Sequence, residues 1–143
     1  MSRFAKILLS LGLCLGLSLP ALAERKVSFA DLEVHYSAFN SSFLQPDIAA
    51  AKELVRSKNQ GVLNIAVLKA GKASTANVSG QIKDLASREQ PLSFRQVTEG
   101  EAIYYLAQFP ITHHEQLRFT INVSVAGGES HSFEFNQEVF PDQ

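Results

Sequence analysis

Residues 102–125 read AIYYLAQFPITHHEQLRFTINVSV, and their hydrophobic pattern decides the fold. Across residues 117–125, apolar and polar side chains alternate without interruption. Because the side chains of a strand point alternately to its two faces, this pattern predicts a strand with one buried and one solvated face. Residues 102–111 alternate less strictly, and a polar link at 112–116 joins the two segments. A link of this length suits an antiparallel hairpin, which we expect at the centre of the domain.

Other short segments on both sides of this hairpin also have the periodicity of strands. The segment 62–70 is apolar on both faces, which is typical of an inner strand. Further strands are expected at 24–36, with a step near Ala30, and at 74–85, 92–97 and 130–140. About seven or eight short strands separated by turn residues predict an all-β fold. We expect a single antiparallel β-sandwich, immunoglobulin-like in arrangement, with a closed barrel as the alternative.

One segment, 46–58, has the signals of a helix instead. Pro46 suits a first helical turn, and Asp47 and Arg56 have the charges that the helix dipole favours at its two ends. Ile48 and Val55 are part of a narrow apolar stripe with helical spacing. The pattern predicts one short α-helix of about three turns, laid across an end or edge of the sheet.

The first 23 residues have the pattern of a secretory signal peptide. Arg3 and Lys6 precede an uncharged run at 7–19, and Ala21 and Ala23 are small residues at the positions that a signal peptidase reads. We expect cleavage after Ala23, which leaves a β-sandwich domain of residues 24–143 in the periplasm of a bacterium. No later segment is long or apolar enough to cross a membrane as a helix.

Two alternatives for this leader are a retained membrane anchor and a lipoprotein attached at Cys14. The apolar run is short for a spanning helix. Leu13 precedes Cys14 at the position where a bacterial lipobox needs a small residue, which disfavours lipidation. Cys14 is the only cysteine, so the mature domain has no disulfide, thiolate nucleophile or cysteine metal ligand. Its stability must come from a hydrophobic core, for which 120 residues suffice.

Charge and motifs exclude several classes of function. Without Arg3 and Lys6 the chain has 11 basic and 14 acidic residues, a net charge of −3, which argues against nucleic acid as a partner. No phosphate-binding loop, serine-nucleophile elbow or His-Glu-x-x-His motif is present. We therefore expect no cofactor and favour a protein that is not an enzyme.

Two groups of residues remain as candidate sites. His113, His114 and Glu115 could contribute to a metal site, although a solvated loop is the ordinary interpretation of such a cluster. A metal-binding protein or metal-dependent hydrolase using this loop is the alternative function. Phe39, Phe43 and Leu44 lie in a segment that looks irregular, where exposed aromatic side chains would mark a partner-binding site and buried ones would plug the end of the sandwich.

Several segments resemble a known family. They are residues 59–67, residues 91–94, Tyr104 with Tyr105, and the closing strand with Phe133 and Phe135. They resemble the bacterial domain-of-unknown-function family 4426, small exported proteins of Gram-negative bacteria, over nearly all of residues 24–141. The resemblance implies a single periplasmic domain and brings no activity. Our leading hypothesis is a non-enzymatic module that binds another protein or an envelope component, with strand addition at 74–85 as one way to bind. A small-molecule binder with a pocket between the sheets stays open.

Overall fold

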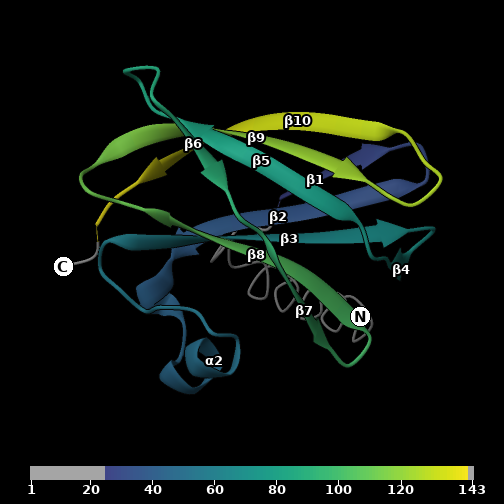
Figure 1. Ribbon diagram of the computed structural model, residues 1–143, viewed down its shortest axis with the longest axis horizontal. Helices are drawn as coiled ribbons and strands as arrows, with labels where there is room; N and C mark the ends of the chain where they lie inside the picture. Colours follow the sequence, from purple (N-terminus) through teal and green to yellow (C-terminus); the bar gives the residue numbers. More distant parts are fainter. Residues whose placement is uncertain (1–24, 142–143) are drawn as a thin grey trace, which may run out of the picture.

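Two antiparallel β-sheets face each other across a hydrophobic core (Figure 1). The structure, a computed structural model, describes residues 25–141, so the expected signal peptide of residues 1–23 lies outside the described residues. The elements in chain order are β1 (Arg25–Phe29), β2 (Leu32–Asn40), the 3₁₀ turn η1 (Ser41–Phe43), α2 (Pro46–Ala51), β3 (Gln60–Lys69), β4 (Lys72–Ala73), β5 (Asn77–Lys83), β6 (Glu89–Leu92), β7 (Arg95–Glu99), β8 (Ala102–Pro110), β9 (Glu115–Ser124) and β10 (Ser130–Val139).

The order of the strands confirms the predicted all-β sandwich. One sheet has the order β1-β2-β3-β8-β7, with β4 paired to β3, and the other has the order β10-β9-β5-β6. The strand at 62–70 is β3, an inner strand as expected, with β2 and β8 as its neighbours. The predicted step near Ala30 is also confirmed. It is a two-residue turn between β1 and β2, in which Ala30 has a φ of +51°.

The predicted central hairpin is wrong in its pairing. β8 pairs with β3 and β7 in one sheet, whereas β9 pairs with β5 and β10 in the other. The link between them crosses from sheet to sheet, and its first residue, Ile111, is fully buried. Both strands direct their apolar faces into the same core, where the rings of Phe109 and Phe119 meet edge to face at 5.2 Å. Alternation identified both strands, but it defines a buried face and not a neighbouring strand.

Two further strand predictions need correction. The segment 74–85 was expected at a sheet edge, but β5 pairs with β9 along its length and with β6 over residues 80–83. Gly80 allows the close approach of β5 to β9, because a Cβ at this position would lie 2.5 Å from the backbone oxygen of Thr120 on β9. The strand expected at 92–97 is divided between β6 and β7, which belong to different sheets.

The helix α2 is shorter than the three turns expected for 46–58. It ends at Ala51, and Glu53 has a φ of +55°, which an α-helix does not contain. The following residues lie against β7 and β8. Lys52 Nζ is 3.1 Å from Glu99 Oε2, and Arg95 Nη1 is 2.6 Å from Glu53 Oε2. The helix and this loop therefore lie on the side of the sheet that faces away from the core, as Figure 1 shows for α2.

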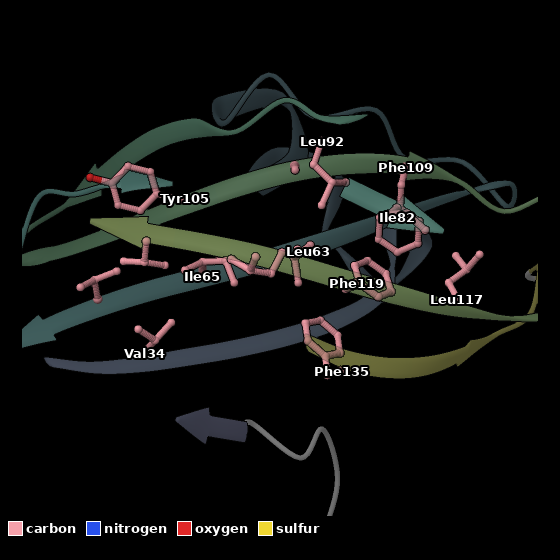
Figure 2. Packing of buried hydrophobic residues seen from close by; sticks show 14 of the residues in the cluster. Val34, Leu63, Ile65, Ile82, Leu92, Tyr105, Phe109, Leu117, Phe119 and Phe135 are labelled. Atoms are coloured by element: carbon pink, nitrogen blue, oxygen red, sulfur yellow. The ribbon is translucent and has the colours of Figure 1, made fainter. Parts of the chain in front are cut away.

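Aromatic and aliphatic side chains from both sheets fill the core (Figure 2). Phe119 is fully buried, and its ring stacks on Phe135 with 4.7 Å between the ring centroids. Leu63 and Ile65 of β3 and Val34 of β2 are also fully buried and complete the opposite wall. Burial of such side chains contributes about 1.5–3 kcal/mol each, which lets a domain without a disulfide fold.

Candidate functional site

The histidine loop does not assemble a metal site within residues 25–141. His113 Nε2 lies 3.6 Å from Glu115 Oε2, whereas His114 Nε2 lies 2.6 Å from Glu138 Oε1 on β10. His114 also stacks on Phe140, with 4.2 Å between the ring centroids. The two neighbouring rings thus contact different carboxylates. No group of three or more histidine, cysteine or acidic residues in the described range could hold a metal ion, for which proteins normally supply three or four ligands.

A cleft of about 260 Å³ lies beside His113, with Asp84, Arg88 and Glu115 in its walls. The carboxylate of Asp84 accepts hydrogen bonds from the backbone N–H and from Nε of Arg88, at 2.9 and 2.8 Å. The backbone bond is the main reason that the pKa of Asp84 is lowered. Asp84 is thus engaged by Arg88. On the other wall, Thr112 Oγ1 lies 3.0 Å from His113 Nδ1, and both of these side chains are exposed to solvent.

The three predicted partner-binding residues lie at the end of β2. Phe39 belongs to β2 and is half-buried, so its assignment to an irregular segment is wrong. Phe43 closes the 3₁₀ turn η1 and exposes 66% of its surface, so it does not plug the end of the sandwich. Leu44 is half-buried, and its backbone N–H donates to the carbonyl of Ser41.

Phe39 and Phe43 border an apolar crevice of about 380 Å³ that opens between the two sheets. One wall is the end of β2 with η1, and the other is the end of β10 with Phe140. The buried side chains of Phe109 and Ile111 line it from within the core. Phe140 exposes 51% of its surface, so two large aromatic side chains stand at the mouth of the crevice.

The crevice is open because β1 covers only part of β2. β1 pairs with residues 32–36, whereas β3 pairs with all of β2 on its other side. Phe29 and Leu32 close the two-residue turn between β1 and β2, and the closing pair of such a hairpin is hydrogen-bonded. Every second residue of β2 from Leu32 onward therefore directs its N–H and C=O toward β1. By this alternation Ala38 and Asn40 direct N–H and C=O toward the side of β1. No strand of residues 25–141 pairs with them there.

Arg25 marks the place where β1 begins and the opening ends. It lies opposite Tyr36, and its Nη2 donates to Gln137 Oε1 of β10 at 2.7 Å. The guanidinium carbon is 5.0 Å from the ring centroid of Tyr36 and 4.7 Å from that of Phe135. A positive charge therefore stands between the two sheets at one end of the crevice.

This fold and site define a small two-sheet sandwich with an apolar opening along one side. The chain belongs to the DUF4426 family, a domain of unknown function, whose model matches residues 26–142. This membership confirms the resemblance seen in the sequence. Within residues 25–141 no helix is long and apolar enough to cross a membrane.

Solved structures with a similar fold include a member of this family. A DUF4426 family protein from Pseudomonas aeruginosa PAO1 is 52% identical, with a TM-score of 0.78, over 84% of this chain and 97% of that one. FetP of uropathogenic Escherichia coli strain F11, expressed recombinantly in the periplasm, is 13% identical with a TM-score of 0.60, over 83% and 95% of the two chains. A copper-bound variant of FetP is 12% identical with a TM-score of 0.55, over 85% and 93%. No curated protein matches the chain.

Of the residues at the crevice, the sequence drew attention to Phe39 and Phe43 and not to Phe140 or Arg25. Phe43 was identified because an aromatic residue stands out in a polar segment. Phe140 was missed because it continues the closing strand, and Arg25 because a charged residue next to the expected signal peptide is ordinary. The unpaired end of β2 depends on the register with β1, which the turn at Ala30 fixes. That turn was the one signal in the sequence that could have indicated the opening.

Proposed function

We propose that this chain is an exported, non-enzymatic module of the bacterial envelope that binds a partner protein at the crevice between β2 and β10. The observation that carries this function is the exposure of Phe43 and Phe140 at the mouth of an apolar opening. Large aromatic side chains are rarely left exposed together without a reason, and they are enriched at the centres of protein interfaces. Export is supported by the leader pattern of residues 1–23.

The chemistry of the crevice also supports binding over catalysis. Its inner wall is apolar, with Phe109 and Ile111 at the base. Glu138, which lines the crevice, is paired with His114 at 2.6 Å, and His114 also stacks on the Phe140 ring. A site of this kind desolvates apolar side chains and orients them, which is what a docking surface requires.

The test is capture of partners from envelope extract of the source bacterium by the mature chain and by two variants. The double variant Phe43→Ser with Phe140→Ser removes both rings from the mouth of the crevice. Leu85→Ser is the matched control, because Leu85 is 81% exposed and lies in the β5–β6 loop, away from the crevice. We expect a stoichiometric partner that is retained by Leu85→Ser and lost by the double variant. A partner retained equally by all three proteins would contradict binding at this crevice.

A further inference from the structure

We infer that the partner binds as an extended C-terminal peptide, which adds to β2 in line with β1 and places its terminal carboxylate at Arg25. This inference deepens the proposed function and rests on it. It names the binding mode, the direction of the bound segment and the chemistry of its last residues. Three features of the described residues carry it: an unpaired strand edge, the face to which that edge directs side chains, and the charge at its end.

The strand edge supplies the main-chain hydrogen bonds. Ala38 and Asn40 direct N–H and C=O into the space that β1 would occupy if it continued, and both residues line the crevice. An added strand can therefore form the same antiparallel pairs with these two residues that β1 forms with residues 32–36. Strand addition of this kind obtains affinity from the main chain and specificity from alternate side chains.

The register decides which side chains of the peptide enter the crevice. Residues directly opposite each other in an antiparallel pair direct their side chains to the same face. Ala38 shares the parity of Val34, which is fully buried in the core. The peptide residues opposite Ala38 and Asn40 therefore direct their side chains inward, toward Phe109 and Ile111. Two apolar residues separated by one residue of any kind fit this arrangement.

Charge and space together decide the direction of the peptide. β1 occupies the edge from Tyr36 onward, so an added strand must end or turn away at that point. In the antiparallel direction its carboxyl end arrives next to Arg25, whereas a parallel strand would bring its amino end to the same positive charge. A free terminal carboxylate is thus complementary to Arg25 in charge. A peptide that terminates there also avoids a collision with β1.

The chain itself does not supply this strand after the expected processing. Cleavage after Ala23 leaves one residue, Glu24, before Arg25. Arg25, the first residue of β1, lies opposite Tyr36, so Ala38 is two residues beyond the end of β1 and a single preceding residue is too short to reach it. The positions opposite these two residues therefore need a second molecule.

The experiment uses the mature chain 24–143 and synthetic peptides, followed by ¹H–¹⁵N NMR titration. The first peptide is acetyl-Lys-Thr-Val-Thr-Val with a free carboxylate, the second is the same peptide with a C-terminal amide, and the third has serine in place of both valines. We expect the amides of Ala38 and Asn40 to shift with the first peptide. We expect affinity about tenfold lower for the amidated peptide, because a charge-assisted contact is lost, and no binding of the serine peptide.

A backbone variant tests the strand addition directly. The N–H of Ala38 points away from β3, so Ala38→Pro removes no hydrogen bond of the existing sheet but blocks the added one. Ala38→Ser keeps the N–H and is the matched control. We expect the first peptide to bind Ala38→Ser and not Ala38→Pro. If circular dichroism shows that Ala38→Pro is unfolded, hydrogen exchange of the Ala38 and Asn40 amides in the unmodified chain replaces it, and the peptide must slow both.

Several results would overturn the inference, and they differ from failure of the proposed function. Equal binding by the free and amidated peptides removes the role of Arg25. Binding that persists in a folded Ala38→Pro variant, or that decanoate reproduces, shows an apolar ligand in the crevice without strand addition. If no peptide binds while the Phe43→Ser and Phe140→Ser variant still loses its captured partner, the proposed function survives and the C-terminal peptide does not. If that variant keeps its partner, the proposed function itself fails.

Discussion

Gln108 of β8 holds both backbone groups of Val55 in the loop after α2. Its Nε2 donates to the carbonyl of Val55 at 2.8 Å, and its Oε1 accepts from the N–H of Val55 at 3.1 Å. One amide side chain thus replaces the pairing that a strand would provide. This contact fixes the segment that covers the first sheet, in cooperation with the ion pairs of Lys52 and Arg95.

Replacing Gln108 with alanine is expected to free this loop. Two hydrogen bonds are lost, and the protein should be destabilised by about 1–3 kcal/mol in urea unfolding. Gln108→Glu keeps the acceptor and loses the donor, so its free energy of unfolding should lie between those of the unmodified chain and Gln108→Ala. Hydrogen exchange at the Val55 amide should speed up in Gln108→Ala. Unchanged exchange there would show that the ion pairs alone hold the loop.

The strand at 117–125 shows what the sequence could predict and what it could not. Phe119, Ile121 and Val123 are all fully buried, as the alternation required. The pattern did not reveal that the preceding strand belongs to the opposite sheet, because a period of two defines a face and carries no information on the neighbour. The helix at 46–58 was predicted too long for a similar reason. Its apolar spacing continues to Val55, but Glu53 takes a left-handed conformation that no propensity indicates.

For the candidate site, the sequence left open whether the aromatic side chains are exposed or buried, and the structure answers this for Phe43 alone. Phe43 stood out as an aromatic residue among polar ones, and it is exposed. The crevice and the free end of β2 arise from contacts between segments that are far apart in the sequence. Asn40 Nδ2, for example, donates to the carbonyl of Phe140 at 2.7 Å, and these two residues are 100 positions apart. Local patterns contain no information on such contacts.

Gly61 provides a test of packing at the base of the crevice. A Cβ at this position would collide with the ring of Phe109, which is almost fully buried and cannot move outward freely. Gly61→Ala should therefore lower the free energy of unfolding by about 1–3 kcal/mol. Combining it with Phe109→Leu should recover part of this loss, because the smaller side chain leaves room for the methyl group.

The matched control for Gly61 is Gly127→Ala. Gly127 has open space around its Cβ position and a φ of +79°, so alanine there meets only backbone strain. A double-mutant cycle in chemical unfolding separates the two effects. If Phe109→Leu improves Gly127→Ala as much as it improves Gly61→Ala, the collision is not the cause.

The lowered pKa of Asp84 predicts that part of the free energy of unfolding depends on pH. Its pKa is lowered from an ordinary value of 3.8, first by the hydrogen bond from the backbone N–H of Arg88 and further by the Arg88 side chain. Because the folded pKa lies below the unfolded one, the stabilisation is complete above about pH 4 and is lost as the pH falls through the folded pKa. The carboxyl ¹³C titration of Asp84 should show a midpoint below 3.8.

Two variants separate the causes of this shift. Arg88→Gln keeps the backbone N–H, so the pKa of Asp84 should stay below its ordinary value, with only part of the lowering lost. Asp84→Asn should remove the pH-dependent contribution of Asp84, so the free energy of unfolding should fall less steeply below pH 4. A pKa that returns fully to its ordinary value in Arg88→Gln would show that the side chain, and not the backbone, is the main cause.

Metal addition tests the remaining interpretation of the histidine loop. His113 and His114 contact different carboxylates, and no third ligand joins them within residues 25–141, so one equivalent of Zn²⁺ or Cu²⁺ should leave the Tm of the mature chain unchanged. A metal that binds only the folded state must raise the Tm, so the measurement is sensitive to any site of useful affinity. A rise in Tm that His113→Ala abolishes would place a metal at this loop and reopen the question of an enzyme.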